Sequence, residues 1–399
     1  MLQAEQRRLQ LACVVGTRPQ IIKAAAAWPA LHLRYHVTLI DTGQHYDEEL
    51  AGHFFGELRL PPPAHQLGVG SGSPTRQIAA MLDRLEPILL DAHPDAVVVF
   101  GDTNSTLAGA LAAAKLELPL VHVEAGLRSF DRRMPEEQNR VVTDHLADLL
   151  CAPDEMAAAN LRAEGIGGDR QPAEAHAKGR AARVAVVGDL MQDLCAATLD
   201  GVRNPDMVGS GAPEPVAALG LVSGEYLFAT VHRAENRTPE ALREWLALLG
   251  GLDWPVVLAL HPGTHRALDE CDCLVPPNVR VVPPQGYRTS LALQLHAAAV
   301  VTDSGGVQRE AAWLGTPALV LRETTEWPGT LEEAGGRSAL VGRDAARAVA
   351  ALARLAPAAS ARVEAAVRAR SARVPASGAA EAMARALGGW LAGGALPGR

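Results

Sequence analysis

Three carboxylates stand next to predicted strand ends or helix starts, where an α/β enzyme can place acid and base groups. Glu124 follows the apolar run 118–123, Asp102 follows the run 95–100, and Glu136 lies after a proline in the first turn of a predicted helix. Open α/β sheets bind ligands at the carboxyl ends of their strands, and carboxylates in different environments can act as base and acid. The spacing therefore predicts proton transfer, although helix capping alone would also favour acids at such positions.

Arg18 and Lys23 lie five residues apart at the junction between the predicted strand 11–16 and a helix. The partial positive charge of a helix N-terminus adds to these two cations, and together they suit a phosphate or diphosphate. No GxGxxG follows a strand and no GxxxxGK[ST] occurs, so the dinucleotide fingerprint and the P-loop are both excluded. An exposed cationic first turn is the structural alternative.

A second anion site is predicted after the strand 299–302. Gly305 and Gly306 let a ligand approach the backbone closely, while Ser304 can cap the helix that is expected to begin near Val307. Glu310, further along this helix, can accept hydrogen bonds from ribose hydroxyls. A tight turn before a capped helix would explain the glycines but not this acid.

His232 opens a polar stretch, HRAEN, just after the predicted strand 226–230. Isolated histidines are usually surface or core residues. Because this histidine is followed by arginine, glutamate and asparagine at a strand end, a ligand contact is the favoured interpretation.

Apolar runs that alternate with helices predict doubly wound parallel sheets, and the pattern restarts near residue 226. We therefore expect an α/β protein of two Rossmann-like domains that face a central cleft. Residues 1–189 would form the first domain, completed by a C-terminal helix over 378–399, and residues 190–377 the second. A surface loop is predicted over 166–182. The predicted strands are 11–16, 36–40, 95–100, 118–123, 148–152, 183–189, 226–230, 255–260, 278–282, 299–302 and 318–321.

The composition is that of a globular enzyme, with 399 residues, 48% apolar and 21% charged. The net charge of −8 argues against nucleic acid as a partner. No apolar run has the length of a membrane span or a signal peptide, so we expect a cytoplasmic protein without a membrane partner. Cys271 and Cys273 have a spacing that fits neither a zinc site nor a CxxC redox motif, and reduced thiols are expected.

Several of these stretches together resemble the non-hydrolysing UDP-N-acetylglucosamine 2-epimerases, over residues 11–330. The motifs are, in chain order, GTRPQIIK, TGQHYD, GDTNST, HVEAGLRSFDRRMPEEQNR, GDLMQD, TVHRAEN and TDSGGVQREAAWLGTP. The resemblance implies a GT-B fold, a homodimer, a UDP-sugar substrate, and neither a nicotinamide cofactor nor a metal.

The chemistry implied by the resemblance is reversible epimerisation at C2 of UDP-N-acetylglucosamine to UDP-N-acetylmannosamine. UDP would be eliminated to leave a 2-acetamidoglucal and then added back. By the match, the catalytic residues would be Asp102, Glu124, Glu136 and, at the sugar–diphosphate, His232. Residues that bind the UDP-sugar would be Arg18, Lys23, Ser304, Gly305 and Gly306 at the UDP, Glu310 at the ribose, Gln285 near the uracil, and Arg140 as a support for the acidic residues.

Several positions depart from the common pattern of this family. Gln20 replaces a usual glutamate, Ser290 stands where an aromatic residue often covers the uracil, and Trp327 stands where many members have an arginine. Residues 46–47, which follow Gln44 and His45, differ from those with which some members bind a second, activating UDP-sugar. We therefore expect kinetics without such activation.

Three alternatives share some of these features. A sister epimerase for another UDP-2-acetamido sugar, such as a diacetamido uronic acid, would share every motif, and Arg132 or Arg133 could serve a carboxylate at C6. A GT-B glycosyltransferase would need an acceptor groove and would have no use for three carboxylates. A non-catalytic UDP-sugar-binding protein would have no need of the acids or of His232.

Overall fold

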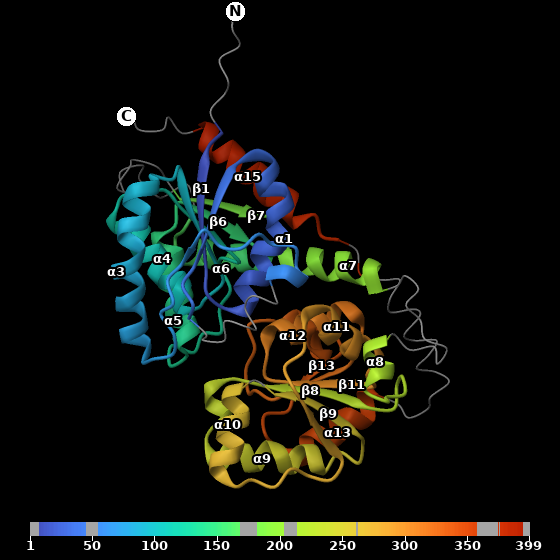
Figure 1. The fold of residues 1–399 in the computed structure, drawn as a ribbon. Helices are drawn as coiled ribbons and strands as arrows, with labels where there is room; N and C mark the ends of the chain where they lie inside the picture. Colours follow the sequence, from blue (N-terminus) through green and yellow to red (C-terminus); the bar gives the residue numbers. More distant parts are fainter. Residues whose placement is uncertain are drawn as a thin grey trace, which may run out of the picture. The chain divides into compact units, whose positions relative to one another are not determined.

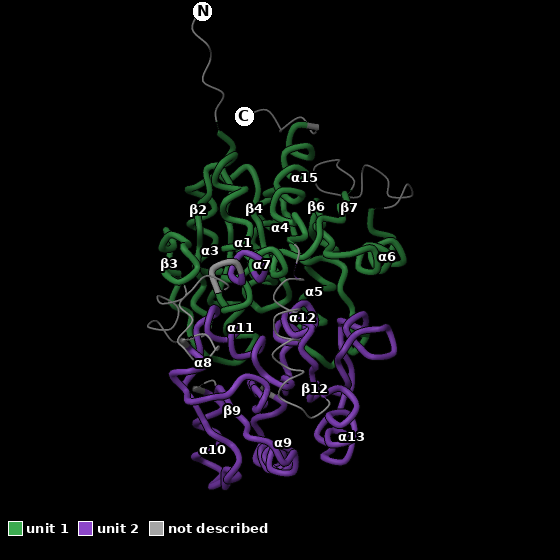
Figure 2. The backbone as a smooth tube through the Cα atoms, turned by 90° about the vertical axis from the view of Figure 1, so that its right-hand side faces the viewer, with its two compact units in different colours: residues 1–194, 376–399 green, residues 195–375 purple. Residues whose placement is uncertain are grey.

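The computed structural model describes residues 8–44, 55–167, 182–202, 214–260, 262–356, 374 and 376–393. The chain divides into two compact units (Figure 2): unit 1 is Met1–Leu194 with Ala376–Arg399, and unit 2 is Cys195–Pro375. The domain boundaries predicted from the sequence fall after residues 189 and 377. Most of the surface loop predicted over 166–182 lies outside the described residues.

Unit 1 contains a sheet whose described strands all pair in parallel, in the order β3-β2-β1-β4-β5-β6-β7. The predicted apolar runs form its centre because strands covered on both faces must be apolar throughout; every residue of β4 is buried. The short β3 was not predicted, since its two exposed residues carry no apolar pattern. The strands are β1 (Gln10–Val15), β2 (His36–Asp41), β3 (His65–Gln66), β4 (Ala96–Phe100), β5 (Leu120–Val123), β6 (Leu149–Ala152) and β7 (Arg183–Val186).

Helices cover both faces of this sheet (Figure 1). The helices α3, α4 and α5 pack side by side, and α1 packs against the C-terminal helix α15. Ser377 Oγ accepts a hydrogen bond from Ala379 N at 3.3 Å, at the start of α15 where the sequence predicts a cap. The helices of unit 1 are α1 (Arg18–Arg34), α3 (Pro74–Ala92), α4 (Asn104–Lys115), α5 (Pro135–Leu146), α6 (Glu155–Ala163) and α15 (Ala379–Gly393), while α7 (Leu190–Val202) runs from unit 1 into unit 2.

Unit 2 contains a second parallel sheet, in the order β10-β9-β8-β11-β12-β13. Its main core cluster surrounds Trp245, which is fully buried. The strands are β8 (Leu227–Val231), β9 (Val256–Leu260), β10 (Val279–Val282), β11 (Ala299–Thr302), β12 (Ala318–Val320) and β13 (Ser338–Leu340). The helices are α8 (Glu214–Ala218), α9 (Pro239–Gly250), α10 (Pro262–Cys271), α11 (Tyr287–His296), α12 (Gly305–Leu314) and α13 (Ala345–Leu355), with short 3₁₀ turns at Ala234–Asn236, Pro328–Thr330 and Glu332–Ala334.

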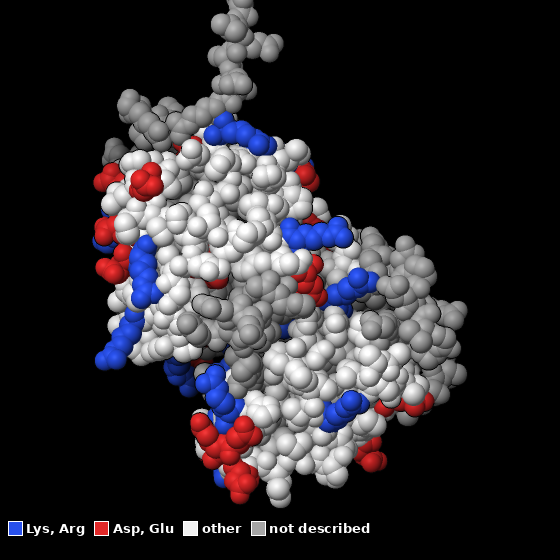
Figure 3. All heavy atoms as spheres, in the orientation of Figure 1, with Lys and Arg blue, Asp and Glu red and all other residues white. Residues whose placement is uncertain are grey.

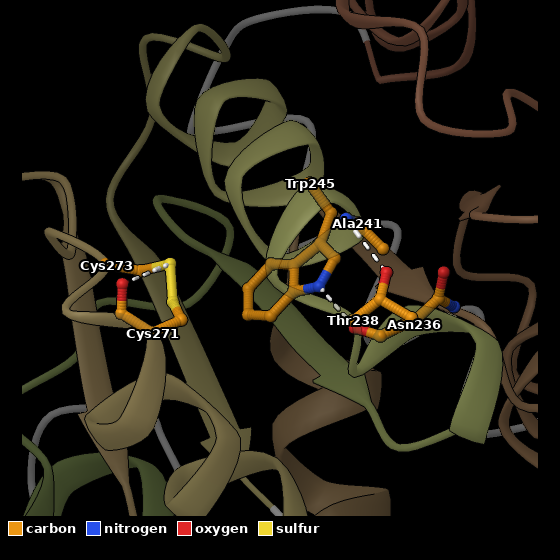
Figure 4. Close-up of a disulfide and its surroundings, with 6 residues drawn as sticks. All are labelled: Asn236, Thr238, Ala241, Trp245, Cys271 and Cys273. Carbon is orange, nitrogen blue, oxygen red and sulfur yellow. Dashed lines mark hydrogen bonds between the residues drawn. A yellow bond between two sulfur atoms is a disulfide. The ribbon is translucent and has the colours of Figure 1, made fainter.

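Cys271 and Cys273 form a disulfide at the end of α10 (Figure 4), so the expectation of reduced thiols is wrong for this pair. The chain reverses over one intervening residue, Asp272, whose φ is +49°, and this brings the two Cα atoms within 5.2 Å. Sequence spacing alone does not reveal such a turn. The thiols of Cys13 and Cys151 are free, and burial raises the pKa of each to about 12.

The predicted fold class is confirmed: each unit is a doubly wound parallel α/β sheet. Within the described ranges, no helix is long and apolar enough to cross a bilayer. On the face drawn in Figure 3, acidic and basic side chains of the described residues are interspersed in small groups.

Candidate active site

The candidate residues named below follow the strands at which each sheet reverses its order, or a strand beside them. In unit 1 the order reverses between β1 and β4, and in unit 2 between β8 and β11. Ligand sites of open α/β sheets lie at the carboxyl ends of such strands. Lys23 lies in the helix after β1, while Asp102 and Glu124 follow β4 and β5; His232 follows β8 and Ser304 follows β11.

Glu124 forms a tight ion pair with Lys23 in unit 1. Its Oε1 accepts a hydrogen bond from Lys23 Nζ at 2.6 Å, and only 10% and 6% of the two side chains are exposed. Glu124 has φ of +70°, a left-handed conformation that a residue other than glycine rarely adopts. Strain of this kind persists where the surroundings fix the chain, often at functional sites.

Gly101 makes room for this ion pair. A Cβ atom at position 101 would lie 2.9 Å from Lys23 Nζ and 3.5 Å from Glu124 Oε1, and the φ of +65° also favours glycine. The sequence predicted that Lys23 binds UDP. In the structure, Lys23 contacts a predicted catalytic carboxylate, and Arg18 lies in the same unit at the start of α1.

Arg140 joins two carboxylates through its guanidinium. Its Nη2 donates to Asp102 Oδ2, and its Nη1 donates to Glu137 Oε2 at 2.7 Å. Asn139 Nδ2 also donates to the backbone oxygen of Asp102 at 2.9 Å. The predicted support of an acidic residue by Arg140 thus has a direct structural counterpart in unit 1.

Glu137 was not predicted from the sequence, where its neighbour Glu136 is the candidate. Glu137 is 2% exposed and also accepts hydrogen bonds from Ser129 N, Ser129 Oγ and Phe130 N, at 2.9 to 3.0 Å. Glu136 is half-buried in the first turn of α5, and its side chain makes no hydrogen bond or ion pair within the described ranges. Only the three-residue spacing from Glu137 to Arg140 signals the structural pair.

Behind these residues lies a buried charged network centred on Asp144. Its Oδ1 lies 2.6 Å from His122 Nδ1, and its Oδ2 accepts from Arg128 Nη1 at 2.7 Å and from Gly126 N at 3.1 Å. Arg128 in turn makes two 2.7 Å contacts to Glu164. Burial alone would raise the pKa of Asp144, but the charges and hydrogen bonds of His122 and Arg128 outweigh it and hold the pKa below its ordinary value.

We expect Asp144→Asn to lower the free energy of unfolding near pH 7 and to lose this difference in acid. Because the pKa of Asp144 is lower in the folded than in the unfolded protein, its stabilising contribution is complete above the unfolded value of about 3.9. The contribution disappears as the pH falls through the folded pKa. Urea unfolding of the wild type and of Asp144→Asn, between about pH 7 and pH 3, measures this contribution. If the two proteins differed in free energy of unfolding by the same amount at both pH values, the electrostatic origin would be contradicted.

Asp303 organises the His232 loop in unit 2. This buried carboxylate accepts hydrogen bonds from His232 N, Arg233 N and Asn236 Nδ2, between 2.8 and 3.2 Å. His232 Nδ1 lies 3.6 Å from Asp303 Oδ1, and 41% of the histidine side chain is exposed. Ser304, Gly305 and Gly306 were predicted from the sequence, whereas Asp303 was not, although an acid directly after β11 is a usable signal.

The helix α12 begins at Gly305, two residues before the predicted start, and Ser304 caps it by accepting from Val307 N at 3.3 Å. A Cβ atom at position 305 would lie 2.9 Å from Glu326 Oε1 and 3.3 Å from Trp327 Nε1. A larger residue at position 305 would require the side chain of Glu326 to shift. Backbone N–H groups in the first turn of a helix are donors suited to a phosphate.

The two residues predicted for the ribose and uracil also lie in unit 2. Glu310 is 4% exposed, and its Oε2 accepts from Gln294 Nε2 at 2.6 Å, so the neighbouring helix α11 orients this acid. Gln285 follows β10, is half-buried, and donates from Nε2 to Pro283 O at 2.6 Å. Ser290, one of the departures from the family pattern, is buried in α11.

The other departures have structural roles. Gln20 is buried and donates to Phe100 O and Thr106 Oγ1, both at 2.9 Å. The guanidinium of Arg309 lies 3.9 Å from the ring centroid of Trp327, a cation–π contact that fixes the indole. Gln44 accepts from the backbone and hydroxyl of Ser105 at 2.9 and 2.7 Å, whereas residues 45–47 lie outside the described part of the chain.

Unit 1 thus carries two carboxylates paired with cations, and unit 2 carries a helix start whose backbone donors suit an anion. Such groups at the carboxyl ends of parallel strands are typical of an α/β enzyme. Among the described residues, no group of three or more histidine, cysteine, aspartate or glutamate side chains could hold a metal ion.

A family model described as UDP-N-acetylglucosamine 2-epimerase matches residues 30–383, and the chain belongs to this family. The UDP-N-acetylglucosamine 2-epimerase of Methanocaldococcus jannaschii is 38% identical over 346 residues, 84% of this chain and 88% of the relative. The UDP-2,3-diacetamido-2,3-dideoxy-D-glucuronate 2-epimerase of Pseudomonas aeruginosa is 37% identical over 326 residues, 80% of this chain and 85% of the relative.

The fold agrees with this relationship. The crystal structure of the M. jannaschii enzyme, in complex with UDP-GlcNAc and UDP, superposes with a TM-score of 0.81 at 35% identity, covering 95% of this chain and 99% of that one. The predicted GT-B type of fold and the predicted family are therefore both confirmed.

Proposed function

We propose that this enzyme reversibly epimerises UDP-N-acetylglucosamine at C2 to give UDP-N-acetylmannosamine. The observation that carries the proposal is the pair of cation-bound carboxylates, Glu124 with Lys23 and Asp102 with Arg140, at the ends of adjacent strands. Support comes from the M. jannaschii relative, solved with UDP-GlcNAc and UDP. The family resemblance implies a homodimer, and we also propose a cytoplasmic location.

The proposed chemistry avoids direct removal of a proton that is not acidic. A carboxylate takes the proton at C2, the C2–H electron pair forms the C1–C2 double bond, and the C1–O electron pair leaves with UDP. UDP then adds back to C1 of the 2-acetamidoglucal while a proton is delivered to the opposite face of C2. The route needs an acid, a base and stabilisation of the leaving diphosphate.

The residues divide between these tasks. Glu124, Asp102 and Glu136 are the proposed acid and base groups, and the cations beside the first two orient them. In unit 2, the first turn of α12 and His232 would bind the diphosphate, Glu310 the ribose, and Gln285 the uracil region.

Proton NMR of the purified protein with UDP-N-acetylglucosamine tests this function. We expect the manno epimer to appear and the mixture to reach the same composition from either epimer. UDP-glucose, which lacks the acetamido group, serves as the control and should stay unchanged. A bound but unaltered UDP-N-acetylglucosamine would contradict the proposal.

A UDP-diacetamido uronic acid is the second candidate substrate, because the P. aeruginosa relative named for such a sugar is 37% identical. The loop before α5 carries one cation suited to its C6 carboxylate. Arg133 is held by Asp131 at 2.8 Å, whereas Arg132 is exposed and has no side-chain ion pair within the described ranges.

If the uronic acid is the substrate, Arg132→Ala should raise its KM about tenfold, the effect of losing one charge-assisted contact. The same change should leave KM for UDP-N-acetylglucosamine unaltered, because that sugar has no charge at C6. Arg133→Ala is the matched control and should affect neither substrate. Equal KM changes for both sugars in Arg132→Ala would rule out selective recognition of the C6 carboxylate.

A further inference from the structure

His122 is a fully buried histidine in the centre of unit 1, and both of its ring nitrogens are engaged. Nδ1 lies 2.6 Å from Asp144 Oδ1, and Nε2 lies 2.7 Å from the backbone oxygen of Gly101. Neither the family motif nor the proposed mechanism assigns this side chain a task. The groups around the ring indicate which of its nitrogens carry protons and which structural elements it links.

The contacts indicate that both ring nitrogens donate. A carbonyl oxygen has no proton to give, so Nε2 must carry the proton in its contact with Gly101. The other oxygen of Asp144 accepts from Arg128 and Gly126, which are donors that suit an ionised carboxylate. Nδ1 therefore donates to Asp144, and His122 is an imidazolium paired with a buried aspartate.

This imidazolium connects the three elements that carry the proposed acid and base groups. Gly101 directly precedes Asp102 at the end of β4, and His122 itself lies in β5, two residues before Glu124. Asp144 lies in α5, one helical turn after Arg140 and on the same buried face. A direct backbone hydrogen bond, from Gly101 N to Val123 O at 2.9 Å, links the same two strand ends.

The charged groups around this link are balanced. Asp144 faces His122 and Arg128, and Arg128 faces Glu164, which also lies 3.6 Å from His145 Nε2. The chain of alternating charges ends near the surface at Glu164, whose side chain is 30% exposed. Fully paired networks of this kind rigidify a core and fix one arrangement of its elements.

We propose that His122 is a positioning residue for epimerisation: its imidazolium fixes Asp102 and Glu124 relative to each other and to α5, through Gly101 and Asp144. The inference rests on the proposed function. It differs from a purely stabilising role because it predicts slower proton transfer in a protein that is folded and binds UDP normally. Misplacement of a reacting group by about 1 Å can cost about 100-fold in rate.

Two variants separate the two contacts of the ring. Asn places its amide nitrogen near the position of Nδ1, so His122→Asn keeps a donor to Asp144 and loses the contact with Gly101. Gln reaches the position of Nε2, so His122→Gln keeps the contact with Gly101. We expect kcat to fall about 100-fold in His122→Asn and clearly less in His122→Gln, with KM and UDP affinity near wild type in both.

Asp148→Ala is the matched control. Asp148 Oδ2 accepts from Leu120 N at 2.8 Å, so it holds the other end of β5, away from the carboxylates. This variant should be less stable but should keep the wild-type kcat. In parallel, ¹⁵N-histidine NMR of the full chain should show two ring N–H signals in the wild type that both variants lose.

The outcomes separate this inference from the proposed function. A wild-type protein inert toward UDP-N-acetylglucosamine would refute the proposed function and, with it, the role of His122 in that reaction. An active wild type with a folded, fully active His122→Asn would overturn only the inference. Equal losses of kcat in both His122 variants and in Asp148→Ala would also overturn the inference. A single ring N–H signal for His122 would do the same.

Discussion

Glu124→Gln is expected to bind UDP like the wild type while losing about 10²- to 10⁴-fold in kcat, the usual contribution of an acid or base group. The amide oxygen can still accept from Lys23 at the buried contact of 2.6 Å, so the fold should persist. The substitution removes the negative charge and the ability to take up a proton, while the hydrogen bond from Lys23 can remain. Asp102→Asn should behave in the same way, since its amide oxygen can accept from Arg140.

Calorimetric titration with UDP and the rate of epimer formation measure the two effects separately. Glu381→Gln is the matched control, because Glu381 also pairs with an arginine, Arg34, but lies in the C-terminal helix α15, outside the strand ends and the His122 network. It should keep nearly full activity. Near-normal turnover in Glu124→Gln or in Asp102→Asn would show that the catalytic assignment of that residue is wrong.

Arg140→Met is expected to lower the free energy of unfolding by about 3–5 kcal/mol, because it leaves the buried carboxylate of Glu137 without its charge partner. Turnover should also fall, since Asp102 loses the guanidinium that orients it. Adding Glu137→Gln should recover part of the stability, because the buried charge is then removed, but should not restore turnover.

Urea unfolding and epimerase rates of the single and double variants test this pair of expectations. The control is Arg133→Met, which breaks an arginine–aspartate pair on the surface, where 91% of the arginine side chain is exposed. Water screens such a pair, so little change is expected. An unfolding curve of Arg140→Met that coincides with the wild type would contradict the structural role assigned to Arg140.

The sheet could be predicted because its signals are local. Runs such as 95–100 and 255–260 are apolar throughout, as strands covered on both faces must be, and the structure has β4 and β9 there. Because the strand ends could be predicted from these local runs, Glu124 and His232 could also be predicted to lie at strand ends. The two-residue β3 has no such signal because both of its side chains are exposed.

Partnerships between distant residues could not be predicted. Lys23 and Glu124 are 101 residues apart, and Asp303 meets His232 across 71 residues, so no local pattern connects either pair. Glu136 and Glu137 have the same side chain at adjacent positions of one helix. Only the burial of Glu137 against the loop before α5 makes it a structural acid.

The central claim is that carboxylates of unit 1 remove the C2 proton while UDP departs. The most direct test of this claim follows two isotope labels in one reaction. UDP-N-acetylglucosamine with ¹⁸O in the bridge between C1 and the β-phosphate is incubated in deuterium oxide with wild type or Glu124→Gln. For the wild type we predict deuterium at C2 and migration of ¹⁸O to non-bridging phosphate positions, with both slowed together in the variant. Epimer that carries no deuterium, or deuterium without ¹⁸O migration even over many turnovers, would contradict the claim.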